Sequence, residues 1–285
     1  MAEDLPNPSL STVTQPGTTS VEPPPDFKER IAETYDAITT YYDQWTLMHR
    51  SQRMNYTALV LRLLQTELSR NGATNGDTNG DTNGNTNGVA PPSELDAPSM
   101  DMLGLGMDMI PVLRGKHALD VGCGSGVPVL ELLLAEEMET IGVDVSAGQL
   151  ALARNHFPEA TAAGQAVWAE KDMMELRYPP DEFHLVVGLY SLLHLPREEQ
   201  TVFLHRAYMW LKPGGILMIN FPKQELEGLV IEHWLDLRDA WMYWSSWGED
   251  KTMQIINELG LEVLLQEETT DVRDGDFVWV IAKKS

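Results

Sequence analysis

The sequence predicts an α/β fold in which helices cover both faces of a mostly parallel sheet. Short apolar segments alternate with helical segments from His117 onwards, and this alternation is typical of parallel strands linked by helices. The first apolar segment runs into a turn with glycines at 122, 124 and 126, and a helix follows the turn. A chain of 285 residues, 43% of them hydrophobic, is long enough to bury a sizeable core around such a sheet.

The chain before this region divides into a tail and a helical segment. Residues 1–26 are rich in Pro, Ser, Thr and acids, and we expect a disordered tail because they offer too little apolar surface for a core. Residues 27–70 carry apolar and aromatic residues at helical spacing, which predicts a helical lid. The aromatic residues from Tyr35 to Trp45 either pack on the core or cover a ligand, with Tyr42 or Trp45 in contact with it.

A repeat of Asn-Gly and Asp-Thr-Asn-Gly units interrupts the pattern. We predict that residues 71–92 are a flexible insertion, because such tracts form neither a helix nor a packed strand. Residues 93–285 are predicted to form the ligand-binding core, which opens with a Met-rich helix at 100–113. Within this core, residues 224–247 are rich in tryptophan and break the alternation of strands and helices, which indicates an insertion.

The remaining elements follow from apolar segments bounded by glycine, proline and charged residues. Strands are predicted at 118–121, 140–145, 167–170, 183–189, 216–221, 261–266 and 277–282. Helices are predicted at 127–137, 147–156, 198–211 and 251–259.

The glycine-rich turn predicts a ligand site. Glycines let the backbone turn sharply and approach a ligand, and the N–H groups of the following helix suit a carboxylate or a phosphate. Dinucleotide-binding folds use a similar loop, so the turn alone does not name the ligand. Here Asp120 lies two residues before the first glycine, and Val127 stands where the dinucleotide fingerprint requires its third glycine.

Acidic residues after two later strands indicate an adenosine site. Asp144 ends the second predicted strand, where a carboxylate can accept hydrogen bonds from both ribose hydroxyls of any adenosine cofactor. Asp172 and Met173 follow the third strand. The acid can accept from the adenine amino group, and the methionine offers a polarisable surface to the ring.

Two further segments carry a family resemblance. The fourth strand leads into G-L-Y-S-L-L-H-L-P-R-E-E-Q (188–200), and the next helix ends in W-L-K-P-G-G-I-L-M-I-N (210–220). Together with L-D-V-G-C-G-S-G, these segments resemble the class I S-adenosylmethionine (SAM)-dependent methyltransferases, in their small-molecule branch (types 11 and 25, ubiquinone-biosynthesis-like). The resemblance implies a Rossmann-like sheet of seven strands with an antiparallel last strand, and SAM as cofactor.

The resemblance also implies which residues hold SAM. The glycine loop would cradle the methionine part, Asp144 would hold the ribose, and residues after the second and third strands would contact the adenine. The implied cofactor-binding residues are Asp120, Gly122, Cys123, Gly124, Gly126, Asp144, Val145, Asp172, Met173 and Leu189.

The candidates for catalysis are His194 and Tyr42. Displacement at a sulfonium methyl mainly requires a well-placed acceptor, and a base is needed only when the acceptor must lose a proton. The resemblance puts His194 near the methyl-transfer side, although a structural role for it stays open. The faces of Tyr42, Trp45 or Tyr243 could meet the sulfonium through cation–π contact. Members of this branch often have a histidine where this chain has Ser246. If that histidine helps to deprotonate the acceptor, its absence leaves His194 or a tyrosine as the remaining candidate.

The leading hypothesis is therefore SAM-dependent methylation of an O, N or C atom of a small, specialised-metabolism acceptor. Aromatic walls with few charges suit a flat and fairly apolar acceptor. One alternative is a methyltransferase-like cyclase of a natural-product pathway, and another is a non-catalytic SAM-binding regulatory subunit. Val127 and the Pro-Gly-Gly turn make a nicotinamide-dependent dehydrogenase improbable.

Composition limits which classes of partner and which cellular compartment we expect. A net charge of −23 argues against nucleic acid and anionic membranes, because phosphate contacts need clustered Lys and Arg. A single cysteine, Cys123, cannot form an internal disulfide, which indicates a reducing, cytoplasmic compartment. We expect neither a signal peptide nor a membrane span, since no apolar run approaches roughly 20 residues. No metal site is expected, and the oligomeric state is left open.

Overall fold

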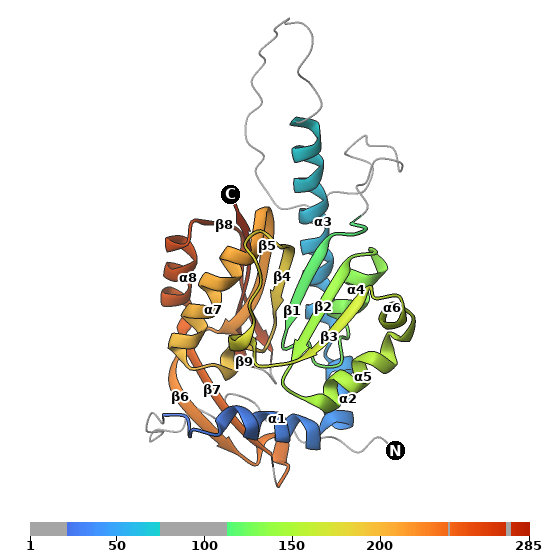
Figure 1. Cartoon of the computed structure of the whole chain (residues 1–285). Coiled ribbons are helices and arrows are strands. Elements are labelled where there is room, and N and C mark those ends of the chain that lie inside the picture. Colours follow the sequence, from blue (N-terminus) through green and yellow to red (C-terminus); the bar gives the residue numbers. More distant parts are fainter. Residues whose placement is uncertain (1–21, 75–112, 239, 272–274) are drawn as a thin grey trace, which may run out of the picture.

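The computed structural model describes residues 22–74, 113–238, 240–271 and 275–285. The predicted tail up to residue 21, the Asn-Gly insertion from residue 75 and the predicted helix at 100–112 lie outside these ranges. Within them, a seven-stranded sheet is flanked by helices on both faces, which confirms the predicted α/β fold (Figure 1).

The central sheet has the strand order β3-β2-β1-β4-β5-β9-β8. Its strands are β1 (His117–Val121), β2 (Glu139–Asp144), β3 (Ala166–Glu170), β4 (Phe183–Gly188), β5 (Leu211–Pro222), β8 (Leu261–Asp271) and β9 (Gly275–Lys284). The pairs among β1 to β5 are parallel, and β9 is antiparallel to both β5 and β8. The predicted antiparallel last strand is thus confirmed, and the strand order reverses between β1 and β4.

The helices cover both faces and one end of the sheet. They are α1 (Phe27–Ala37), α2 (Thr39–Met48), α3 (Ser51–Thr74), α4 (Val129–Ala135), α5 (Ala147–His156), α6 (Pro158–Ala162), α7 (Arg197–Trp210) and α8 (Gly248–Glu258). Short 3₁₀ turns lie at Met173–Glu175, Leu192–His194 and Trp234–Asp236. The sequence did not predict α6, because a helix of five residues is too short to show a helical period.

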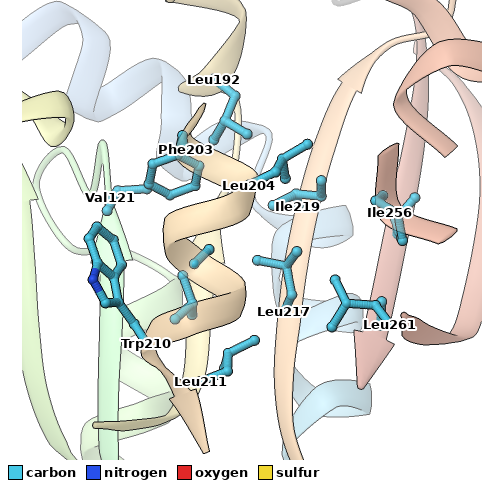
Figure 2. Close-up of a cluster of buried hydrophobic side chains, with 14 of the residues drawn as sticks. Val121, Leu192, Phe203, Leu204, Trp210, Leu211, Leu217, Ile219, Ile256 and Leu261 are labelled. Atoms are coloured by element: carbon cyan, nitrogen blue, oxygen red, sulfur yellow. The ribbon is translucent and has the colours of Figure 1, made fainter. Parts of the chain in front are cut away.

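The strands are apolar on both faces because helices bury both. Leu217 and Ile219 of β5 pack in one cluster with Phe203 of α7 and Ile256 of α8 (Figure 2). Met218, which points to the opposite face, packs in a second cluster with side chains of α3 and α4. Two covered faces hold the strand ends in place, so loops at those ends can carry the functional residues.

Residues 224–247, expected to be an insertion, form an additional two-stranded sheet. Strands β6 (Glu225–Glu232) and β7 (Trp241–Trp247) pair antiparallel, and α1 packs against β7. The Thr34 hydroxyl donates to the Trp241 carbonyl oxygen at 3.0 Å, and the ring of Phe27 meets the ring of Tyr243 edge-on at 5.4 Å between centroids. Helix α1 thus packs on the tryptophan-rich segment.

Helix α1 lies across the end of the sheet, and polar contacts hold both of its ends (Figure 1). At its start, Lys28 Nζ lies 2.6 Å from Asp172 Oδ2 and 2.6 Å from Glu199 Oε2. At its finish, Asp36 Oδ1 accepts a hydrogen bond of 2.5 Å from the hydroxyl of Ser146, the N-cap residue of α5. These contacts fasten α1 over the strand ends.

Candidate functional site

A cleft opens at the carboxyl ends of β1, β2 and β4, where the strand order reverses. Ligands of open parallel sheets bind at such reversal points. Side chains of α1, α2 and α3 complete its walls. Of the predicted site residues, the following line it: Tyr42, Asp120, Gly122, Cys123, Gly124, Asp144, Val145, Asp172, Met173, Leu189 and His194.

The glycine loop is shaped by close backbone approaches. Gly122 has a φ of +69°, and a Cβ there would lie 2.3 Å from the Cβ of Ser191, so only glycine fits. Gly126 has a φ of +81°, and a Cβ would lie 2.8 Å from a ring carbon of Phe157. Gly126 therefore packs behind the loop and, unlike the other implied cofactor-binding residues, does not line the cleft.

Asp144 ties the loop to the end of β2. Its Oδ2 accepts from the Gly124 N–H at 2.8 Å, and its Oδ1 accepts from the Ser146 N–H at 2.9 Å. Burial raises the pKa of Asp144, while these backbone donors oppose the shift. The carboxylate is thus fixed in orientation at the cleft wall.

Asp120 is the most perturbed acid of the cleft. It is buried at the end of β1, and burial, together with the charge of Asp144, raises its pKa to about 8. The positive charge of Arg53 acts in the opposite direction. Burial also raises the pKa of the Cys123 thiol well above its ordinary value, so this thiol stays protonated at neutral pH.

Asp172 is held from two sides. Its Oδ1 accepts from the Met174 N–H at 2.9 Å, and its Oδ2 pairs with Lys28. The acid predicted to meet the adenine is therefore linked to α1. Lys28 was not predicted, and no sequence spacing connects it with Asp172.

His194 is held in one tautomer by two partners. Its Nδ1 lies 3.1 Å from the carbonyl oxygen of Tyr243, and its Nε2 lies 3.0 Å from the hydroxyl of Tyr35. A carbonyl oxygen can only accept a hydrogen bond, so Nδ1 carries the hydrogen of the neutral ring. Nε2 therefore accepts a hydrogen bond from the Tyr35 hydroxyl. Burial lowers the pKa of His194 to about 4, which keeps the ring neutral at pH 7. Tyr35 lines the cleft as well, a role the sequence reasoning did not assign to it.

Of the aromatic residues predicted to contact the ligand, one lines the cleft and two do not. Tyr42 lines the cleft and meets Tyr35 edge-on at 5.0 Å between ring centroids. Trp45 stacks on Tyr42 at 5.7 Å, outside the cleft lining. Tyr243 is 1% exposed and packs under α1, so the suggestion that its ring faces the cofactor is wrong. Its carbonyl group, instead, orients His194.

Ser246 has a structural role. Its hydroxyl donates to the Pro222 carbonyl oxygen at 2.9 Å and accepts from the Gly248 N–H at 3.0 Å, which joins β5 to the start of α8. It lies outside the cleft lining, whereas His194 and Tyr35 both line the cleft. Among the described residues, no cluster of His, Cys, Asp and Glu suits a metal ion, and no helix is long and apolar enough to cross a membrane.

Comparisons with known proteins agree with this geometry. A family profile described as "Methyltransferase domain" matches residues 118–215, from β1 into β5. The chain is 32% identical over 112 residues to 27-O-demethylrifamycin SV methyltransferase of Amycolatopsis mediterranei, covering 39% of this chain and 40% of that protein. It is 30% identical over 107 residues to an O-methyltransferase of Aspergillus nomiae, covering 38% of this chain and 47% of that protein. Residues 118–215 therefore match a methyltransferase domain, and both relatives are named methyltransferases.

A solved structure extends the likeness of this methyltransferase domain to the whole fold. Magnesium protoporphyrin IX methyltransferase from Synechocystis PCC 6803, with bound SAM, aligns over 93% of this chain and 100% of its own, with a TM-score of 0.54. The sequence identity is 15%, so the likeness concerns the fold alone. The chain spans less than half the length of the two curated relatives above.

Proposed function

We propose that the protein transfers the methyl group of SAM to an O, N or C atom of a small, specialised-metabolism acceptor. The Tyr35–His194 pair carries this proposal, because it faces the same cleft as the glycine loop and Asp144. The names of the relatives, which include O-methyltransferases, support a small-molecule acceptor and, in particular, a hydroxyl. We propose the cytoplasm as the compartment, since the lone Cys123 cannot form an internal disulfide.

The cleft residues fit SAM in shape and charge. Gly122 and Gly124 line the cleft without side chains, which lets a ligand approach the loop backbone, and Asp144 lies at the strand end where this fold holds a ribose. Asp120 beside the glycine loop suits a cationic ligand group, whose charge would favour the ionised form of this acid. When bound, SAM supplies a methyl group activated by its sulfonium.

The protein's part is to position the acceptor and to accept its proton. The acceptor hydroxyl can donate to the Tyr35 oxygen while the Tyr35 proton moves to His194 Nε2, which leaves an imidazolium supported by the Tyr243 carbonyl. A base with a pKa near 4 suffices because the acceptor oxygen becomes strongly acidic as it forms its new bond. Tyr42 and Tyr35 present ring faces and edges that exclude water and suit a flat acceptor.

Incubation with methyl-labelled SAM tests the proposal. The purified protein is mixed with a cell extract separated into small-molecule, protein and nucleic-acid pools, and the label is followed. We expect label in the small-molecule pool, its loss in Asp144→Ala, and a drop in rate of about 100-fold in His194→Gln. His205→Gln, an exposed histidine on α7, is the matched control and should keep the wild-type rate. Label in the protein pool, or none in any pool despite tight SAM binding, would reject the proposed reaction.

A further inference from the structure

The segment that carries His194 is joined to strand β7 by the side chain of Gln200. Gln200 lies near the start of α7 and is 6% exposed. Its Nε2 donates to the carbonyl oxygen of Leu195 at 2.9 Å and to the carbonyl oxygen of Ser245, in β7, at 3.0 Å. A buried amide requires such partners, because it has lost its hydrogen bonds to water. One side chain thus connects the residue after His194 with the residue two positions after Tyr243.

Ser245 strengthens this connection from the side of the strand. Its hydroxyl is buried, donates to the Leu195 carbonyl oxygen at 2.5 Å and accepts from Gln200 Nε2 at 3.0 Å. The register of β6 and β7 shifts next to Ser245, which has no paired residue in β6. At this irregularity, the carbonyl group of Ser245 bonds to Gln200. The irregular point of the strand pair is thus the point at which β7 is fastened to α7.

This connection sets where the Tyr243 carbonyl group lies relative to the imidazole of His194. The carbonyl oxygen accepts from Nδ1 at 3.1 Å, and Nε2 lies 3.0 Å from the hydroxyl of Tyr35. Loss of the Nδ1 contact would let the ring exchange its hydrogen between the two nitrogens, since each tautomer is chosen by its hydrogen-bond partners. The direction of the proton-accepting nitrogen therefore depends on how closely β7 is held to residues 194 and 195.

We propose that Gln200 is a positioning residue, which keeps His194 in the tautomer protonated at Nδ1 with Nε2 directed at Tyr35. Gln200 lies outside the cleft lining, so it acts on the site through the carbonyl groups of Leu195 and Ser245. In the segment H-L-P-R-E-E-Q (194–200), the last residue thus orients the first. This inference rests on the proposed function, in which Nε2 accepts the proton of the acceptor by way of Tyr35.

Nitrogen-15 NMR of the histidine side chains, recorded on the full chain at pH 7, tests the inference. The His194 signals are identified by their absence in His194→Gln. In the wild type we expect a protonated Nδ1 and an unprotonated Nε2. In Gln200→Met, which keeps the length of the side chain but cannot donate, the two signals should move towards each other because the ring exchanges between tautomers.

Two further measurements separate positioning from a general loss of structure. The transfer of label from methyl-labelled SAM to the small-molecule pool should be about 10-fold slower in Gln200→Met, because the base is misdirected. The Kd for S-adenosylhomocysteine, measured by calorimetry, should change less than about threefold, which shows that the variant is folded.

Gln254→Met is the matched control, because Gln254 lies on α8 and is exposed. Its His194 signals should equal those of the wild type. Ser245→Ala provides a second test with a smaller change in the core, because it removes only the hydroxyl that bonds to Leu195. It should move the His194 signals in the same direction as Gln200→Met does, by a smaller amount.

The inference is overturned if Gln200→Met leaves both nitrogen signals of His194 at their wild-type positions. It is also overturned if the wild type carries the hydrogen on Nε2, or if the signals move only in variants that no longer bind S-adenosylhomocysteine. The NMR measurement needs neither cofactor nor acceptor, so a failure of the proposed function is distinguishable. An unchanged rate in His194→Gln would refute transfer through this histidine, whereas the effect of Gln200 on its tautomer would stand.

Discussion

Replacing His194 with glutamine tests whether the half-buried imidazole stays neutral in the folded protein. Burial lowers its pKa from 6.5 to about 4. The unfolded chain therefore takes up the proton first as the pH falls, and stability that is present at pH 7 is lost between about pH 6.5 and pH 4. At about 1.4 kcal/mol per pKa unit, the complete loss is about 3 kcal/mol, of which about 2 kcal/mol falls between pH 7 and pH 5.

Urea unfolding at pH 7 and pH 5 measures this loss. The wild type should lose about 2 kcal/mol more free energy of unfolding between the two pH values than His194→Gln does. His205→Gln should behave like the wild type, because that histidine is exposed. Carboxylates titrate in all three proteins, so their contributions cancel in the comparison. An equal loss in His194→Gln and the wild type would refute the argument that burial keeps this ring neutral and ready to accept a proton.

Three other outcomes are expected. Tyr35→Phe should lower kcat about 10- to 100-fold, because it removes the hydroxyl that passes the proton to the imidazole of His194. The Kd for S-adenosylhomocysteine should change little. An unchanged kcat in steady-state assays would exclude this route for the proton. In urea unfolding, Gly122→Ala should destabilise the fold by about 1 to 3 kcal/mol more than Gly164→Ala does. Both glycines have a positive φ, but only a Cβ at position 122 would meet Ser191. Equal effects would contradict the close approach of Gly122 to Ser191. Binding of S-adenosylhomocysteine should strengthen as the pH rises from 7 towards 8.5, because the pKa of Asp120 is about 8 and its ionised form attracts the ammonium. Calorimetry on Asp120→Asn should show a flatter pH dependence, and a curve as steep as the wild type's would assign the effect to another group.

The elements of the central sheet could be predicted because each has a local signal. β1 and β4 are short apolar runs bounded by polar or glycine-rich turns, and α5 begins at Ser146, whose hydroxyl caps the helix. The strand pair β6–β7 was missed, although aromatic residues and the alternation of acidic and apolar residues in Glu225–Glu232 are signals for strands. Of its tryptophans, Trp234, Trp241 and Trp244 pack in one cluster with residues of α1.

By itself, the sequence determined the part of the cleft around the glycine loop. Asp120 and Asp144 lie at the carboxyl ends of β1 and β2, and glycines 122 and 124 follow β1. Parallel strands bring their carboxyl ends to one edge of the sheet, so order along the chain is enough to gather these residues. Only the tertiary structure decided the rest of the cleft. Tyr35 and His194 are 159 residues apart, and Lys28 and Asp172 are 144 apart. Such pairs depend on how α1 packs across the strand ends. This packing is set by the buried area and the shape of the contacting surfaces, and it leaves no periodic pattern in the sequence.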